Sequence, residues 1–158
     1  MVLSVGEVNK NKNHKVGIEA LARMNDTNVY YVICGRGPLM EAHRELAKEL
    51  GVESRVILTG YRTDVVDFYK MADVFLFPSF REGLPVAVIE AMASGLPVIA
   101  TRIRGSNDLV QQGALLQPTD ADGMAKAIGN AQLCNVKYEK TAFDINIVIE
   151  IMKTIYGV

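Results

Sequence analysis

The sequence predicts one α/β domain built on a mostly parallel sheet of six strands. Short apolar runs rich in β-branched and aromatic residues alternate along the chain with longer segments of helical periodicity. This alternation is typical of βαβ units, in which a helix connects two parallel strands. A length of 158 residues is enough for a substantial apolar core, so we expect residues 1–158 to form a single domain.

In the first half of the chain, short apolar runs predict strands and apolar residues at spacings of three and four predict helices. Gly51 stands just after one such helix, where tolerance of positive φ lets glycine end it. Asp64 is predicted to cap the next helix. In chain order, these strands and helices are expected at residues 2–5, 14–24, 29–34, 38–50, 55–58 and 65–71.

The second half continues the same alternation. Pro85 suits the first turn of a helix, where its missing N–H costs nothing, and Gly95 suits the end of that helix. The last helix is apolar on more than one side, so it packs either on this sheet or against a partner, and residues 130–141 before it are a candidate linker. The elements are expected at residues 74–77, 85–94, 98–100, 114–116, 121–133 and 145–156.

Composition argues against several classes of function. The net charge is −1 and there is no basic stripe, so we expect no nucleic-acid partner. Apolar runs end well short of the roughly 18 residues of a membrane span, and no signal peptide is expected after Met1. Cys34 and Cys134 are isolated thiols, which predicts a reducing cytoplasm and no metal site. His14 and His43 are expected on helix surfaces, without a role as ligands or bases.

The segment at residues 78–101 carries the most informative pattern. It sets Glu82 and Glu90 eight positions apart around a Gly-Leu-Pro turn, between two apolar runs. The predicted helix begins at the carboxyl end of a strand, where open α/β sheets bind phosphorylated ligands, and its free N–H groups suit a diphosphate. Glu90 would lie roughly 8 Å further along the helix axis, at a distance that suits the hydroxyls of a ribose. The segment therefore predicts a site for a nucleoside diphosphate.

The residues of this turn have individual predicted tasks. Gly83 allows the backbone to approach a ligand closely. The N–H groups of Leu84 and Val86 are candidate donors to the distal phosphate, whereas Pro85 only shapes the turn. Alternatively, these residues do no more than cap a helix. Glu90 stands among apolar neighbours, so its carboxylate needs a partner or an open cleft.

The spacing of the two glutamates resembles the E-x7-E signature of the family-4 (group 1) glycosyltransferases, which have the two-domain GT-B fold. The opening strand and loop at residues 4–14, the Gly-x-Gly-Pro turn at 35–38 and the Thr-Gly-Tyr-Arg loop at 59–62 resemble the same family. The resemblance runs from Leu3 to the last helix. It implies a Rossmann-like three-layer sandwich, the C-terminal half of a GT-B fold, with the N-terminal acceptor domain absent from this sequence.

The resemblance also implies roles for individual residues. Glu82 faces the donor sugar and Lys12 holds the diphosphate, and these two are the candidate catalytic residues. Gly6 leaves room for the phosphates after the first strand, and Arg62 belongs to the loop beside the base. The rest of the implied donor site consists of Gly83, Leu84, Pro85, Val86 and Glu90.

One departure from the family pattern concerns the phosphate clamp. Many relatives have Arg directly after the glycine that corresponds to Gly6, whereas this chain has Glu7. Because a carboxylate cannot neutralise a phosphate, either Lys10 or Lys15 takes that place, or Glu7 points away. A solvated basic loop is the alternative interpretation of Lys12 and its neighbours.

The function that the resemblance implies is donor binding in a retaining hexosyltransferase. The expected donor is a nucleotide sugar, by default a UDP-sugar, and no metal or other cofactor is expected. The sugar would pass to a surface-glycan or lipid-linked acceptor held by the N-terminal domain, so this domain alone is expected to be inactive. The full-length protein is expected in the cytoplasm, in peripheral association with the inner face of the plasma membrane, in polysaccharide biosynthesis.

Other functions stay open on the sequence alone. A nucleotide-sugar 2-epimerase shares the GT-B architecture, and a non-catalytic nucleotide-sugar-binding module would have the same sequence features. A glycoside hydrolase also uses two carboxylates, but it needs them in an open sugar groove and not beside a phosphate-binding turn. A nicotinamide dinucleotide domain is disfavoured because the turn after the first strand has Gly6 alone in place of G-x-G-x-x-G.

Overall fold

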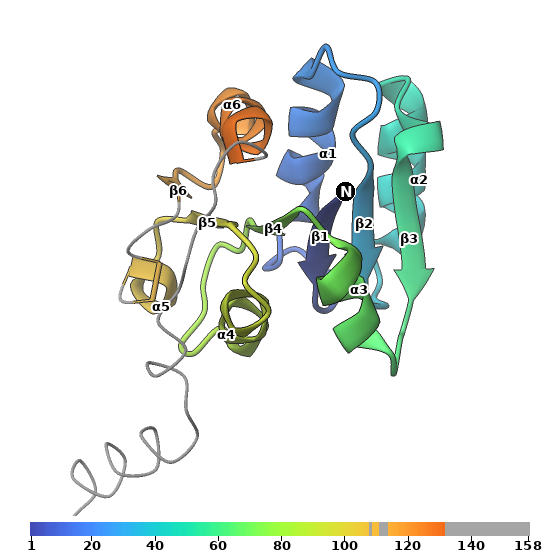
Figure 1. The fold of residues 1–158 in the computed structure, drawn as a ribbon. Coiled ribbons are helices and arrows are strands. Elements are labelled where there is room, and N and C mark those ends of the chain that lie inside the picture. Colours follow the sequence, from blue (N-terminus) through green and yellow to red (C-terminus); the bar gives the residue numbers. More distant parts are fainter. Residues whose placement is uncertain (108, 111–113, 132–158) are drawn as a thin grey trace, which may run out of the picture.

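The computed structural model describes residues 1–107, 109–110 and 114–131, which form a three-layer α/β/α sandwich (Figure 1). Its sheet has six strands in the order β3-β2-β1-β4-β5-β6, and each neighbouring pair is parallel. The predicted α/β fold and six-stranded sheet are therefore confirmed, and the sheet is parallel throughout. The expected helix at 145–156 and Cys134 lie outside the described residues.

The strands agree closely with the predicted ones, and two short elements come in addition. The strands are β1 (Val2–Val5), β2 (Tyr31–Cys34), β3 (Val56–Gly60), β4 (Val74–Phe77), β5 (Val98–Thr101) and β6 (Ala114–Leu116). The helices are α1 (His14–Arg23), α2 (Met40–Glu49), α3 (Val65–Met71), α4 (Val86–Ala93), α5 (Arg104–Asn107) and α6 (Ala121–Ala131), with a 3-10 turn, η1 (Glu53–Arg55). Neither α5 nor η1 was expected, because so few residues show no helical periodicity.

Both faces of the sheet are covered by helices, which explains its continuous apolar strands. Helices α1, α2 and α6 lie on one face, and α3, α4 and α5 lie on the other (Figure 1). Side chains alternate across a strand, so in β4 Val74 and Leu76 join the core under α1, while Phe75 and Phe77 join the core under α4. A strand buried on both faces reads as an unbroken apolar run.

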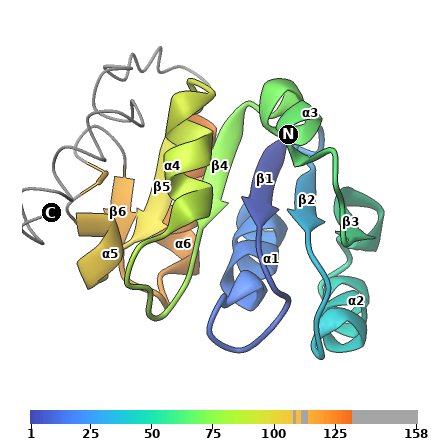
Figure 2. The same ribbon diagram turned by 90° about the horizontal axis from the view of Figure 1, so that it is seen from below.

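The strand order places a topological switch point between β1 and β4. From β1 the chain proceeds to β2 and β3 on one side, and from β4 to β5 and β6 on the other. Open α/β sheets bind ligands at such a point, outside the carboxyl ends of the strands. Figure 2 shows the β1–α1 loop and the β4–α4 loop together at that edge of the sheet.

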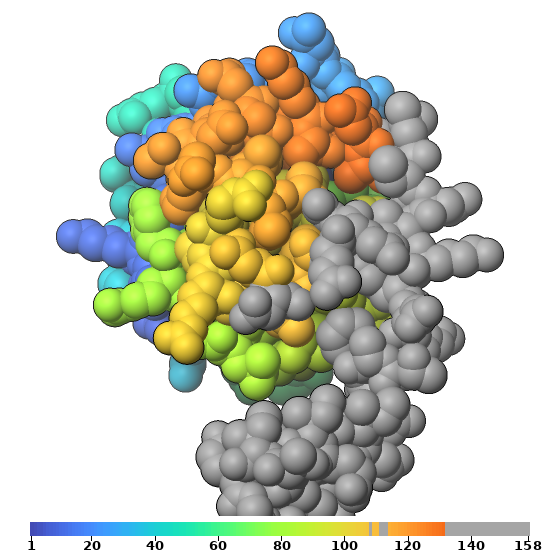
Figure 3. Space-filling model, turned by 90° about the vertical axis from the view of Figure 1, so that its left-hand side faces the viewer, coloured from blue at the N-terminus to red at the C-terminus, as the bar shows by residue number. Residues whose placement is uncertain are grey.

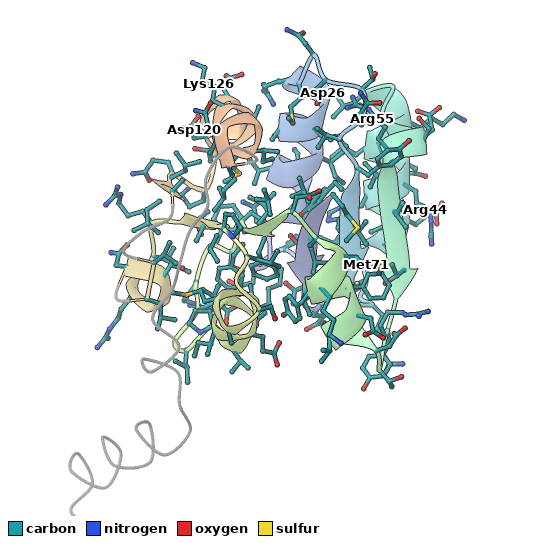
Figure 4. All side chains as sticks on the ribbon, in the orientation of Figure 1. Asp26, Arg44, Arg55, Met71, Asp120 and Lys126 are labelled. Atoms are coloured by element: carbon teal, nitrogen blue, oxygen red, sulfur yellow. The ribbon has the colours of Figure 1, made fainter. Side chains whose placement is uncertain are left out.

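The opposite edge of the sheet is closed by local contacts. Arg55, just before β3, donates to the carbonyl oxygen of Asp26 at 3.1 Å and to that of Leu21 at 3.3 Å. Figure 4 shows Asp26 and Arg55 at this edge, far from the two loops of the switch point. A third view, in Figure 3, shows α5 and α6 on the face toward the viewer. Among the described residues, no helix has the length and apolar character that a bilayer span requires.

The residues predicted at helix ends are found there, but one of them does not make the predicted capping hydrogen bond. Gly51 and Gly95 follow α2 and α4 with φ of 68° and 79°, as expected for glycines that end helices. Asp64 occupies the position that precedes α3, yet its carboxylate makes no capping hydrogen bond. It accepts instead from the guanidinium of Arg62, at 2.8 Å from Nε. Competition from this nearby cation explains the missing cap.

The expectation that both histidines lie on helix surfaces is wrong. His14 is 2% exposed and His43 is 4% exposed, and their rings meet edge to face with centroids 6.3 Å apart. His14 Nδ1 lies 3.3 Å from the hydroxyl of Tyr31, which also lies 2.8 Å from Ser4 Oγ. The two rings fill the contact between α1 and α2. Burial lowers the pKa of both imidazoles, that of His14 to about 3.

Candidate functional site

The loops after β1 and β4 bring the two candidate catalytic residues into contact. Lys12 Nζ lies 2.7 Å from Glu82 Oε1, and each side chain is 20% exposed. The ion pair therefore stands at the switch point between β1 and β4, partly shielded from solvent. Partial shielding makes the pair less sensitive to salt than a fully exposed one.

The position of Lys12 depends on Gly6 and on the loop between them. A Cβ built on Gly6 would lie 3.2 Å from Lys12 Cε, and Gly6 has a φ of 150°, which other residues rarely adopt. The N–H of Lys12 donates to Asn9 Oδ1 at 3.0 Å, and its ammonium lies 5.2 Å from the ring centroid of Phe77. The space that Gly6 leaves open is therefore taken by the lysine stem.

Asn11 contacts the same carboxylate oxygen of Glu82 as Lys12 does, and no sequence pattern predicted this contact. Asn11 Nδ2 donates to Glu82 Oε1 at 3.2 Å and to the carbonyl oxygen of Arg81 at 2.8 Å. Its own carbonyl oxygen accepts from the N–H of Phe80 at 2.8 Å. Nothing in the sequence distinguishes Asn11 from Asn9, which lies two positions away in the same polar loop.

A further asparagine, Asn13, anchors the end of this loop. It has a left-handed backbone, with φ of 53°, and is 8% exposed. Its side-chain amide donates to the carbonyl oxygens of Pro78 and Pro118, at 3.0 and 2.9 Å. The β1–α1 loop is therefore tied to the β4–α4 loop at several points along its length.

The Gly-x-Gly turn after β2 has a clear steric reason. A Cβ on Gly35 would overlap the carbonyl oxygen of Gly6, and a Cβ on Gly37 would overlap that of Val8. The N–H of Val8 donates to the carbonyl oxygen of Arg36 at 3.0 Å, so the two loops pack backbone against backbone. Only glycine at these positions allows so close an approach.

The turn before α4 is arranged slightly differently from the prediction. Pro85 occupies the capping position that precedes α4, one residue earlier than expected. The N–H of Val86 donates to the carbonyl oxygen of Leu84 at 3.0 Å, so this predicted phosphate donor is already engaged. The N–H of Leu84 has no hydrogen-bond partner among the described residues. Gly105 lies against the turn, since a Cβ there would come within 2.6 Å of the Gly83 carbonyl oxygen.

Glu90 was expected to need a partner or an open cleft, and the structure gives its carboxylate a partner. Its side chain is exposed, and its Oε2 accepts a hydrogen bond of 2.9 Å from the hydroxyl of Tyr69. Tyr69, on α3, is 3% exposed. Burial, and after it the hydrogen bond to Glu90, raises the pKa of the Tyr69 hydroxyl well above its usual range, so Tyr69 stays a donor. The carboxylate thus has a partner within the protein and also remains open to solvent.

Arg62 lies apart from the Lys12–Glu82 pair. Its guanidinium pairs with Asp64 and stacks over the ring of Phe68, 5.3 Å from the centroid. The pairing with Asp64 raises the pKa of Arg62. The structure therefore places Arg62 in the β3–α3 loop, in contact with α3 and not with Lys12 or Glu82.

The other basic residues of the first loop do not join Lys12 either. Lys15 Nζ lies 3.5 Å from Glu19 Oε1 on α1. Lys10 lines a separate cleft of about 550 Å³, which Asn9, His43 and Phe80 also line. Glu7 is exposed. Among the described residues, no three His, Cys, Asp or Glu side chains gather as a metal site would require.

Comparisons with known proteins agree on one family. A family model described as "Glycosyl transferases group 1" matches residues 1–132. The UDP-Gal:alpha-D-GlcNAc-diphosphoundecaprenol alpha-1,3-galactosyltransferase of Escherichia coli is 33% identical over 132 residues, which cover 78% of this chain and 34% of that protein. The chain spans about a third of the length of the curated relatives it matches.

Solved structures show the same architecture. The apo form of the lipopolysaccharide outer core galactosyltransferase WaaB superposes with a TM-score of 0.82 at 24% identity, over 99% of this chain and 48% of that one. HepE of Anabaena, in complex with UDP, superposes with a TM-score of 0.80 at 21% identity, over 99% of this chain and 49% of that one. At these identities the likeness shows the fold.

Proposed function

This chain belongs to the group 1 glycosyl transferases, and we propose that it binds the nucleotide-sugar donor of a retaining sugar transfer. The observation that carries the proposal is the Lys12–Glu82 pair at the switch point, beside the start of α4. A cation for phosphate and an acceptor for sugar hydroxyls stand there side by side. The name of the Escherichia coli relative and the UDP complex of HepE support a UDP-sugar as donor.

The diphosphate would lie between Lys12 and the N-terminus of α4. A lysine ammonium attracts phosphate as a point charge, and the positive end of a helix dipole adds to this attraction. The unpartnered N–H of Leu84 would donate to a phosphate oxygen. The exposed carboxylate of Glu90 would accept from the ribose hydroxyls, because Tyr69 engages only one of its oxygens.

Glu82 and Lys12 would act on the reacting end of the donor. Glu82 would accept hydrogen bonds from sugar hydroxyls and so orient the sugar. As the bond between the anomeric carbon and the diphosphate breaks, negative charge builds up on the diphosphate. Lys12 and the α4 dipole would stabilise that charge, which is electrostatic stabilisation of a leaving group. No metal is needed for this step, since these groups supply the positive charge.

The acceptor is proposed to be a lipid-linked or surface glycan, presented at the cytoplasmic face of the plasma membrane. The Escherichia coli relative is named for a diphosphoundecaprenol acceptor, and WaaB for the outer core of lipopolysaccharide. Both names describe galactosyltransferases, which makes UDP-galactose the first donor to test.

Calorimetric titration with UDP, GDP and ADP tests the proposal. We expect selective binding of UDP, and roughly tenfold weaker binding to Glu90→Gln, since the change removes a charged hydrogen-bond acceptor. Glu41→Gln is the matched control, because Glu41 is exposed on α2 and pairs only with Arg44. The proposed donor site is refuted if the folded chain binds none of the three nucleotides. It is also refuted if the Glu90→Gln variant binds UDP as tightly as the unmodified chain does.

A further inference from the structure

The charge of Lys12 is already satisfied by a protein group. Its ammonium lies 2.7 Å from Glu82 Oε1, and both side chains are only 20% exposed. A diphosphate that approaches Lys12 therefore meets a carboxylate in the place that one of its own oxygens would take. Like charges this close repel each other strongly when solvent screening is incomplete.

The two lysines that flank Lys12 in the sequence do not join the pair. Lys15 is engaged with Glu19, and Lys10 faces the separate cleft beside α2. Of these three lysines, Lys12 alone would thus serve both the carboxylate and the diphosphate. Entry of the diphosphate must weaken the Lys12–Glu82 contact.

Glu82 is held in this competing position by a second residue. Asn11 Nδ2 donates to Oε1, the same oxygen that faces Lys12, and also to the carbonyl oxygen of Arg81. The N–H of Phe80 in turn donates to the carbonyl oxygen of Asn11. These contacts join adjacent positions of two loops, so the carboxylate has a defined resting place.

We propose that Glu82 is a built-in competitor of the diphosphate for Lys12, and that Asn11 is the positioning residue that returns it there. An intact nucleotide sugar relieves the competition, because its sugar hydroxyls donate to Glu82 and draw the carboxylate away from Lys12. A free nucleoside diphosphate offers no such hydroxyls. The device therefore favours the donor over the spent diphosphate and speeds release of the product. This inference rests on the proposed donor site.

The test is the affinity for UDP, measured by calorimetry, in the whole chain and in Glu82→Gln. Removing the competing charge is expected to tighten UDP binding roughly fivefold. This factor corresponds to the interaction free energy of a partly shielded ion pair. The affinity for UDP-galactose should gain less or fall, because the sugar loses its carboxylate partner. The ratio of the two affinities is the decisive quantity, since a purely structural role would change both alike.

Two further variants make the test specific. Glu7→Gln removes an equal charge from the same loop, and because Glu7 is exposed we expect less than a twofold change. Asn11→Ala should tighten UDP binding in the same direction as Glu82→Gln, by a smaller factor. If the unmodified chain binds UDP and Glu82→Gln binds it equally or more weakly, the competition is refuted and the donor site stands. If neither binds UDP although both are folded, the donor site itself is refuted.

Discussion

Glu90, a residue of the predicted donor site, is supported by Tyr69 from a neighbouring helix. The buried hydroxyl of Tyr69 donates to Glu90 Oε2 at 2.9 Å and holds an otherwise exposed carboxylate in one orientation. Removing the hydroxyl in Tyr69→Phe frees the carboxylate, so we expect roughly threefold to tenfold weaker UDP binding. Calorimetry measures this change. Tyr30→Phe, at a half-exposed tyrosine before β2, is the control, and equal affinities in both variants would contradict the role.

The buried histidines predict a dependence of stability on pH. The pKa of His14 falls from 6.5 to about 3 on folding because burial disfavours the charged imidazole. Below pH 6.5 the unfolded chain therefore binds a proton that the folded chain does not, so the free energy of unfolding falls as the pH falls. The loss continues until the pH reaches about 3. We expect about 1 kcal/mol less stability at pH 5.5 than at pH 7.5 from His14 alone.

Urea unfolding at these two pH values measures the effect. His14→Gln should show a smaller difference between them than the unmodified chain, with His43 contributing in the same direction. An unchanged pH dependence in His14→Gln would mean that His14 does not titrate on unfolding as proposed.

At the residue scale, site residues that belong to a sequence motif could be predicted. Residues whose role comes from their neighbours in the fold could not. The resemblance singled out Lys12 and Glu82, and the structure brings them into contact. Asn11 and Tyr69 carry no motif, and only the packing of loops and helices gives them partners. The histidines were misjudged because a polar residue in a helix reads as exposed, whereas here two of them pack against each other.

At the scale of elements, substitution by alanine is expected to change stability in opposite directions at two glycines. Gly35→Ala would place a methyl group on the Gly6 carbonyl oxygen and push the β1–α1 loop away, so we expect a loss of roughly 3 kcal/mol or more. Among the described residues outside the surrounding helix backbone, no atom lies within 4 Å of a Cβ built on Gly129, inside α6. Gly129→Ala should therefore stabilise the chain by about 0.5–1 kcal/mol. Chemical denaturation compares the two variants, and a neutral Gly35→Ala would show that the loop can move without cost.

The same scale explains which element boundaries were predictable. Long periodic helices and unbroken apolar strands were found because burial on one or both faces is visible in a single sequence. The end of β3 was not predicted. This strand continues to Gly60, and its register with β2 shifts between Ile33 and Cys34. Such a shift depends on the partner strand. The turn at α5 was missed for a related reason, because Gly105 is fixed by the carbonyl oxygens of the turn before α4.

At the scale of the whole molecule, the strand order explains why residues so distant in sequence meet. Because β1 and β4 are neighbours and parallel, the loops that follow them emerge at one edge. The alternation of strands and helices predicts a parallel sheet, but no periodicity gives the order of the strands. The family resemblance implied this arrangement, and the superposition on WaaB agrees with it.

The chain aligns with only part of each relative, and this leads to a prediction about its sugar-transfer activity. The donor site that we propose consists of loops at the switch point, and this chain contains those loops. The chain aligns with only about a third of the Escherichia coli galactosyltransferase, so most of that protein, including what we propose to be its acceptor-binding part, lies outside the aligned region. We therefore expect the 158-residue chain to bind UDP without transferring sugar.

Two measurements on one sample test this expectation. Thermal unfolding with UDP at 100 times its dissociation constant should show about 2.7 kcal/mol of added stability, which demonstrates a folded, occupied site. A transfer assay with labelled UDP-galactose and a lipid-linked acceptor should then give no product above background, with the full-length Escherichia coli relative as positive control. Product formation by the chain alone would mean that the acceptor, too, binds to these 158 residues. If the chain is inactive and UDP does not stabilise it, the result counts against donor binding. The inactivity would then reflect a missing donor site and not only a missing acceptor site.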